Sequence, residues 1–456
     1  MNARRTMGIA AIVALSGCAV GPDYTRPAMQ APEAWKETGS WKAAEPADNV
    51  PRGKWWQAFG DPVLDGLMEK VSVSNQSLKA AEARYRQAQA AVASARAGFF
   101  PAVSVGASAT RSRNANAPSV TTYGASADLR WEIDLWGRVR RAVEAAQAGA
   151  QASQGDLDAA RLSLQARLAQ NYFLLRVTDV QRDLYNDTVA AYTKSLELTK
   201  NRYDAGVAAK TEVVQAEAQL LQTRAQYLDL DTTRAQLEHA IAALVGLAPA
   251  QFDLPPAPLV AKLPPIPPGL PSTLLERRPD IAAAERRVAA ANAQIGVAKA
   301  AYFPALTLPG SIGFSSTTFG HLFDVPNRFW SIGPALGVTL LDFGVRGAAV
   351  DAAVATWDES TANYRQAVLT GFQDVEDNLA TLRILAEEAQ VQDDAVRASR
   401  ETLLLTTNQY KAGTANYLAV VVVQTQQLAN ERSAVILLGR RLTASVGLIL
   451  ALGGSY

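Results

Sequence analysis

The sequence predicts a mixed α and membrane-β fold, in which a tandem-repeat protomer carries long coiled-coil helices plus two β-hairpins. Three observations predict this fold. The 456-residue chain repeats itself at a nearly constant offset, four stretches alternate between apolar and polar residues, and two long helical stretches contain no helix breaker. The near balance of 44 Lys+Arg against 43 Asp+Glu argues against a nucleic-acid partner.

The internal repeat is visible as pairs of matching segments. These lie 203 or 207 residues apart and are 97–102 with 300–305, 136–137 with 343–344, and 201–206 with 408–413. We therefore expect two tandem copies of one unit, at 75–248 and 278–456. Between them, the segment 249–277 is rich in proline, which cannot continue a helix and favours an extended linker.

Each copy is expected to contain a helix, a β-hairpin, a long helix and a final helix, in that order. In the first copy these elements are predicted at 77–99, 102–135, 137–203 and 207–246. In the second copy they are predicted at 280–301, 305–341, 344–410 and 414–452. Ser77 and Asp280 are the predicted N-caps of the first helices, because short polar side chains accept hydrogen bonds from free backbone N–H groups.

Strict alternation of residue types predicts the hairpins. From Tyr123 to Leu135 the odd positions are apolar, whereas the even positions are small, polar or charged. The same period begins at Val103 and, in the second copy, at Leu306 and Trp330. These strands reach the ~9–11 residues that a tilted strand needs to cross a bilayer. A soluble antiparallel sheet with one face on a core is the alternative interpretation.

Four strands cannot close a barrel, and lipid tolerates no open sheet edge. A membrane role for the hairpins therefore requires oligomerisation. Three chains would supply 12 strands, an even number that such barrels use.

The long helical stretches would each span about 100 Å. In the second copy, apolar residues recur every seven positions, which is typical of a coiled-coil seam: Val368, Val375, Leu382, Ala389, Val396 and Leu403. Asp179 and Arg182 interrupt the matching register in the first copy. A coiled-coil scaffold would explain these helices, but it would explain neither the hairpins nor the N-terminus.

The N-terminus is typical of a targeting signal. Residues 1–17 combine two arginines with an apolar run too short for a mature transmembrane helix. The residues before Cys18 resemble the lipobox of bacterial lipoproteins, which implies cleavage there and acylation of the cysteine. Ala19, by the same resemblance, favours sorting to the outer membrane. An ordinary signal peptide followed by an incidental cysteine is the alternative.

The segment 18–74 is expected to follow the signal as an acylated N-terminal segment. It would pack on the equatorial region of the repeats, that is, around the middle of their long helices. Large apolar side chains would anchor it there: Trp35, Trp41, Trp55 and Trp56.

Several motifs stand in a specific order from residue 18 to the end of the chain, namely Val20-Gly21-Pro22-Asp23-Tyr24, Trp55-Trp56, Asp134-Leu135-Trp136-Gly137-Arg138 and Glu276-Arg277-Arg278-Pro279-Asp280-Ile281. Together they resemble outer-membrane factors of the TolC/OprM class, in the lipoprotein (NodT) branch. The resemblance implies a homotrimeric duct, with a 12-stranded β-barrel in the outer membrane continued by an α-helical barrel in the periplasm. It also implies a periplasmic membrane-fusion adaptor and an inner-membrane pump as partners, for the efflux of drugs or other small molecules.

The resemblance also implies which residues carry the function. The apolar face of the hairpins would meet outer-membrane lipid, and the barrel lumen would be lined by Asp128, Arg130, Glu132 and Asp134. The periplasmic tip and gate would comprise Tyr203, Asp204, Gly206, Glu212, Tyr410, Gly413, Ala415 and Ala419. Family members often carry acidic residues just after the second tip, but 413–422 contains none. We therefore expect an apolar constriction in place of an acidic ring.

Two other classes of protein are the alternatives. An enzyme is disfavoured because the sequence has no phosphate-binding loop, no G-x-S-x-G and no H-E-x-x-H motif, and its two histidines are far apart. We accordingly predict no catalytic residue, cofactor or metal. A lipid-anchored periplasmic scaffold without a channel is the second alternative. It would be soluble once Cys18 is replaced, whereas a duct would still require detergent.

Overall fold

The computed structural model describes residues 19–29, 32, 34–37, 53–115, 118–266 and 277–454. The predicted signal at 1–17, Cys18, Trp41 and the linker residues 267–276 lie outside this described part. The chain forms two compact units. Unit 1 comprises Met1–Met29, Glu82–Asp156 and Ala282–Ala367, and unit 2 comprises Gln30–Ala81, Leu157–Ile281 and Val368–Tyr456.

Two very long helices run through both units, α4 (Arg138–Asp204) and α8 (Val345–Lys411). Each has 67 residues, and each lies within one residue of its predicted bounds. At 1.5 Å per residue, each helix is about 100 Å long.

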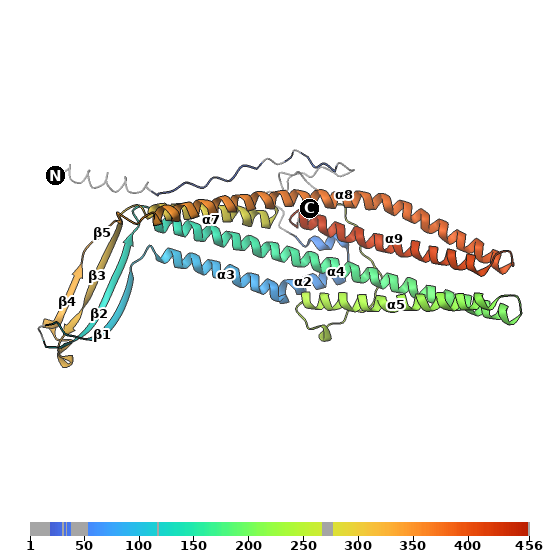
Figure 1. Ribbon diagram of the computed structural model, residues 1–456, viewed down its shortest axis with the longest axis horizontal. Helices are drawn as coiled ribbons and strands as arrows, with labels where there is room; N and C mark the ends of the chain where they lie inside the picture. The colour runs from blue at the N-terminus through green and yellow to red at the C-terminus, as the bar shows by residue number, and fades with distance from the viewer. Residues whose placement is uncertain are drawn as a thin grey trace. The chain divides into compact units, whose positions relative to one another are not determined.

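Unit 1 is built around one antiparallel sheet, whose strands lie side by side in Figure 1. The strands are β1 (Ala102–Ser112), β2 (Val120–Ile133), β3 (Ala305–Ser316), β4 (Arg328–Ile332) and β5 (Ala335–Gly337). Most of α3 (Gln76–Ala97) and of α7 (Pro279–Ala300) also belongs to this unit. The strand order is β1-β2-β3-β4, and β5 also pairs with β3. The β2–β3 pairing therefore joins the hairpins of the two copies.

The second hairpin differs from its predicted form. The sequence predicts one strand from Trp330 to Leu340, but the structure interrupts it at Gly333 and Pro334 and ends β5 at Gly337. Proline has no N–H to donate to a ladder, so an uninterrupted strand is disfavoured there. Two short 3₁₀ turns, Phe319–His321 and Val325–Asn327, fill the connection between β3 and β4.

Unit 2 contains η1 (Trp55–Phe59), α2 (Pro62–Ser74), α5 (Lys210–Leu244), η2 (Pro249–Gln251) and α9 (Tyr417–Ala451), together with the second parts of α4 and α8. Phe59 is fully buried against Phe173 of α4, with ring centroids 4.9 Å apart. Asp61 caps α2 by accepting from the N–H groups of Val63 and Leu64, and its second oxygen accepts from Tyr172 Oη at 2.7 Å. The N-terminal segment is thus held on α4.

Two predicted N-caps are wrong. Asn75, not Ser77, caps α3, because its Oδ1 accepts from Leu78 N at 2.9 Å. Helix α7 begins at Pro279, so Asp280 lies in its first turn and forms a 2.6 Å ion pair with Arg278. Proline is favoured at the first helical position, where its missing N–H has no partner to lose.

A buried charged cluster explains the irregular heptad of the first copy. Asp179 is 3% exposed and binds Arg176 of α4 at 2.9 Å and Arg234 of α5 at 2.8 Å. The two arginines also donate to the backbone carbonyls of Leu254 and Pro255 in the proline-rich linker. Asp179 therefore stands at a seam position that would otherwise be apolar. Through its two arginine partners it helps to bind the linker.

Helix α9 is long and apolar enough to cross a membrane by length and composition alone. Half of its most apolar window is buried within the protein. Leu442, Val446, Leu448 and Ile449 are all fully buried. The apolar character of α9 is accounted for by the core of unit 2.

Candidate functional site

The sheet of unit 1 has one apolar face that is continuous across all its strands. Directly opposed residues of antiparallel strands share a face, so the register decides which side chains lie together. One row contains Val103 opposite Leu129, and another contains Ala127, Ile312 and Trp330. The apolar residues on this face are Val103, Val105, Ala107, Ala109, Tyr123, Ala125, Ala127, Leu129, Trp131, Ile133, Leu306, Leu308, Ile312, Phe314, Trp330, Ile332 and Leu336. The odd face predicted for one strand thus extends over both hairpins.

The opposite face of the sheet is polar. Asp128 lies at its centre, where its carboxylate accepts from Ser126 Oγ at 2.9 Å and from Ser311 Oγ of β3 at 2.7 Å. The register places Arg130 on this face as well. These side chains are exposed and can meet water.

The two remaining predicted lumen residues lie where β2 leads into α4. Glu132 forms a bidentate ion pair with Arg138, at 2.7 and 2.5 Å. Asp134 follows the last residue of β2, and its carboxylate accepts from the N–H groups of Val139 and Arg140. Asp134 was expected in the lumen, but its contacts are those of a helix cap at the start of α4.

Aromatic side chains gather at the helix-proximal end of the sheet. Trp131 Nε1 donates to Phe99 O at 3.0 Å, and Trp136 Nε1 donates to Pro304 O at 2.7 Å. The Trp136 ring stacks on Phe303 at 4.9 Å. Aromatic girdles of this kind mark membrane interfaces in β-barrels. The repeated Phe-Phe-Pro and Tyr-Phe-Pro segments supply part of this girdle, a role that the sequence analysis missed.

The predicted tip turns have the same geometry in both copies. Gly206 has φ +72° and Gly413 has φ +75°, a left-handed conformation that favours glycine. Val207 N donates to Arg202 O, and Thr414 N donates to Gln409 O. Each turn therefore ends its long helix with a Schellman motif.

Residues from four helices pack together next to these turns. The buried cluster comprises Tyr192 and Leu196 of α4, Val213, Ala216 and Leu220 of α5, Tyr410 of α8, and Tyr417 and Val420 of α9. Tyr410 Oη donates to Glu212 Oε2 at 3.3 Å, and the Arg202 guanidinium lies 4.7 Å from the centre of the Tyr410 ring. Burial raises the pKa of Tyr410 and of Tyr417. Both phenols therefore stay protonated at neutral pH.

The structure brings only some of the predicted tip residues into this cluster. Glu212 and Tyr410 contact each other, and Tyr417, which the sequence analysis did not select, packs on Tyr410 with ring centroids 5.4 Å apart. Tyr203, Asp204, Gly206 and Gly413 are exposed at the turns, while Ala415 and Ala419 are half-buried at the start of α9.

The N-terminal residues 19–26 lie on the helices of unit 1. Val20 N donates to Trp136 O at 3.0 Å, and Asn292 Nδ2 donates to Pro22 O at 3.0 Å. Arg141, which is 5% exposed, binds Asp23 at 2.9 Å and donates to Val20 O. The Val-Gly-Pro-Asp-Tyr motif is therefore held on these helices by hydrogen bonds and an ion pair. We call residues 19–26 the strap, and this segment begins beside the aromatic girdle.

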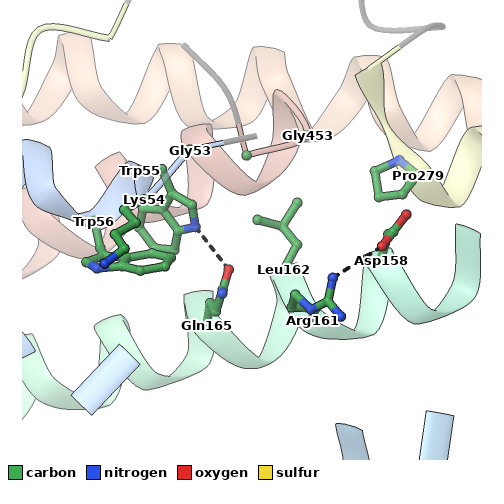
Figure 2. A pocket seen from close by; sticks show the side chains of 11 residues that line it. Gly53, Lys54, Trp55, Trp56, Asp158, Arg161, Leu162, Gln165, Pro279 and Gly453 are labelled. Carbon is green, nitrogen blue, oxygen red and sulfur yellow. Dashed lines mark hydrogen bonds and ion pairs between the residues drawn. The ribbon is translucent and has the colours of Figure 1, made fainter. Parts of the chain in front are cut away.

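A pocket of ≈ 250 Å³ in unit 2 marks the junction of the N-terminal segment with both copies (Figure 2). Trp55 Nε1 points to Gln165 Oε1 at 3.4 Å, and Arg161 pairs with Asp158 at 3.5 Å. The pocket is completed by Trp56, Leu162, Pro279 and Gly453. Within each of these two pairs, the polar side chains contact each other, which is typical of a packing junction. Among the described residues, no group of three metal-ligating side chains is present.

Comparison with known proteins places this geometry in a family. A family model described as outer membrane efflux protein matches residues 67–247 and 270–454. The probable efflux pump outer membrane protein TtgC of Pseudomonas putida is 31% identical, over 97% of this chain and 93% of its own length. The pyoverdine export outer membrane protein OpmQ of Pseudomonas aeruginosa is 30% identical, over 100% of this chain and 98% of its own.

Solved structures agree with these relatives. The outer-membrane channel OprN superposes with a TM-score of 0.89 at 31% identity, covering 96% of this chain and 99% of that one. The open state of the MtrE outer membrane channel of Neisseria gonorrhoeae gives a TM-score of 0.85 at 29% identity, covering 96% and 98%.

An antiparallel sheet with one lipid-compatible face, joined to very long paired helices, is the architecture of an outer-membrane channel. The chain belongs to the outer membrane efflux protein family. It is the outer-membrane channel component of an efflux pump, in a family of transporters rather than enzymes. The fold class, function and outer-membrane location predicted from the sequence are confirmed.

Proposed function

We propose that three copies of the chain form a continuous exit duct, in which three sheets close a barrel and the long helices extend it into the periplasm. The barrel has 12 strands when β4 and β5 of each copy are counted as one interrupted strand. The observation that carries this proposal is the pair of open sheet edges. Within the part of the chain that the structure describes, strand β1 pairs only with β2, and β4 and β5 pair only with β3. Lipid offers no hydrogen-bond partner to such edges, so each edge must pair with the opposite edge of a neighbouring copy.

In this duct, the apolar face of the sheet meets lipid and the polar face lines water. Asp128 and Arg130 then lie in the lumen. Glu132 and Asp134 lie at the junction with the helices, where their partners are Arg138 and the start of α4. The duct would pass drugs or other small molecules that an inner-membrane pump delivers through a periplasmic adaptor. The names of the relatives, which refer to efflux pumps and to pyoverdine export, support this assignment.

The tip cluster is the proposed gate. The contacts of Tyr410 with Glu212 and of Ser195 with Tyr417 fasten the α8–α9 pair to the α4–α5 pair. The segment 413–422 contains no carboxylate, so the constriction would close through apolar contacts near Ala415 and Ala419 rather than through an acidic ring. The exposed turn residues Tyr203, Asp204, Gly206 and Gly413 would face the adaptor.

Acylation of Cys18 is the third part of the proposal. The strap supports it, because a Cβ on Gly137 would lie only 2.9 Å from Ala19 Cα, so residue 19 lies against the chain just after Trp136. Cys18 precedes Ala19 in the sequence, and its acyl chains would enter lipid beside the barrel. The barrel, rather than the lipid, would hold the protein in the membrane.

Planar-bilayer recording on the detergent-purified protein tests the proposal, with Cys18→Ala as the matched variant. The duct account expects discrete conductance steps from both proteins and the same oligomer mass for both. A Cys18→Ala protein that is soluble without detergent and gives no conductance would instead support the periplasmic scaffold.

A further inference from the structure

Two arginines lie on the apolar face of the sheet. Arg111 is opposite Thr121, on the same face as the neighbouring Ala109–Tyr123 row, and Arg328 is opposite Phe314. Both side chains are exposed. A cation on the lipid-facing side of a strand is destabilising at mid-depth but is tolerated near the interface.

Both arginines are at the end of the sheet that lies farthest from the helices. Arg111 is the second-last residue of β1, and Arg328 is the first residue of β4. At this outer rim, each side chain can keep its aliphatic stem on apolar surface while its guanidinium reaches the headgroup layer.

Aromatic residues mark the same rim as a membrane interface. Phe319 packs edge-on to Tyr123 at 5.3 Å, and Phe323 packs edge-on to Phe314 at 5.5 Å. Tyr123 and Phe314 belong to the apolar face, yet Phe319 and Phe323 remain 70% and 69% exposed. The β3–β4 connection thus extends the lipid-facing surface outward with two more rings.

Within the described ranges, the two guanidinium groups have no carboxylate partner. Arg111 donates to Ser119 Oγ at 3.2 Å, and neither arginine has a carboxylate within ion-pair distance among the residues that the structure describes. Asp324, an acid in the nearby connection, is 2.8 Å from His321.

Closure of the barrel would bring the two arginines toward each other. Arg111 is on the β1 edge and Arg328 on the opposite β4 edge, so each boundary between copies would place one of each on neighbouring strands. Like charges on neighbouring strands repel each other unless an anion lies between them.

We propose that Arg111 of one copy and Arg328 of the next bind the phosphorylated headgroup of an outer-leaflet glycolipid at each boundary. This inference rests on the trimeric barrel of the proposed function. The attraction is that of a basic surface for an anionic headgroup, and each arginine is expected to contribute about a fivefold gain in affinity.

The experiment titrates the detergent-purified protein with fluorescent lipid A, in its bisphosphorylated form and in a dephosphorylated form. The wild-type protein should bind the bisphosphorylated form more tightly, by about 25-fold if both arginines act. The Arg111→Gln/Arg328→Gln variant should bind the two forms equally. Arg130→Gln is the matched control, because it removes the same charge from the opposite face of the same sheet and should keep the preference.

Native mass spectrometry on the same samples gives the oligomer mass, and so distinguishes failure of the headgroup site from failure of the trimeric duct. A trimer that shows no phosphate preference, or whose preference survives the double substitution, overturns the headgroup site and leaves the duct intact. A protein that is not trimeric removes the duct and the headgroup site together. Loss of the preference in Arg130→Gln would show that overall charge, not the rim, attracts the lipid.

Discussion

At the scale of single residues, Asp179 is a polar residue whose role is to hold neighbouring elements together. It interrupts an apolar seam, yet it is buried with two arginine partners that also hold the linker carbonyls. A buried charge of this kind is tolerated only because it is fully paired. The cluster therefore fixes α4, α5 and the linker to one another.

Replacement of Asp179 by Asn should destabilise unit 2 strongly. The buried Arg176 and the partly buried Arg234 would lose their shared carboxylate, at a cost of about 3–5 kcal/mol. Asp231→Asn is the matched control, because Asp231 forms a 2.7 Å ion pair with Arg182 but is 42% exposed, so its loss should cost less than about 1 kcal/mol. Thermal unfolding of the two purified variants measures the difference. Equal melting temperatures would contradict the role of the buried cluster.

Ala419 offers a direct test of the apolar constriction. Three aspartates introduced by Ala419→Asp would create an acidic ring and should lower the divalent-cation concentration for half-block by about tenfold. Ala429→Asp adds the same charge about 15 Å farther along α9 and should have a much weaker effect. Single-channel recording with added Mg²⁺ measures the block. An unchanged block in Ala419→Asp would place the constriction elsewhere.

At the scale of elements, the bounds of the long helices were predicted more accurately than the residues that cap helix N-termini. The long helices lie within one residue of prediction because their apolar and alanine-rich pattern extends over many turns. Their starts depend on single contacts, such as Asn75 Oδ1 with Leu78 N or the Asp134 carboxylate with Val139 N. Several neighbouring polar residues could make each contact, so sequence alone does not choose among them.

The strands show a different limit of prediction. Alternation assigns each side chain to a face, but it does not determine which strand lies next to which. The β2–β3 pairing joins hairpins that are about 200 residues apart in the sequence. For the same reason, the outward placement of Arg328 and the tip contact of Tyr417 emerged only from the structure.

The glycine turns give the clearest prediction at this scale. Gly206 has φ +72° and no neighbouring atom within 4 Å of a built Cβ, so Gly206→Ala should cost only its backbone strain, about 1 kcal/mol. Gly246 has a similar φ of +78°, but its Cβ would lie 2.4 Å from Ser74 O. Gly246→Ala should therefore lower the melting temperature substantially more. Similar melting temperatures for the two variants would contradict the close approach at Gly246.

At the scale of the whole molecule, the duplication accounts for the channel. Each copy supplies one hairpin and one pair of long helices, and each ends its helices with glycine turns of the same form. With β4 and β5 counted as one interrupted strand, the described part of one chain provides four strand positions with two open edges, which is insufficient for lipid. Assembly is therefore a requirement of the fold once it enters a membrane.

The most direct test of the duct is electron microscopy of the Cys18→Ala protein in detergent, combined with its oligomer mass. We predict a three-fold particle of three chains, longer than the roughly 100 Å that one long helix spans, with a closed ring at its membrane end. A monomer, or a soluble particle without a ring, would contradict the closure of three sheets into one barrel.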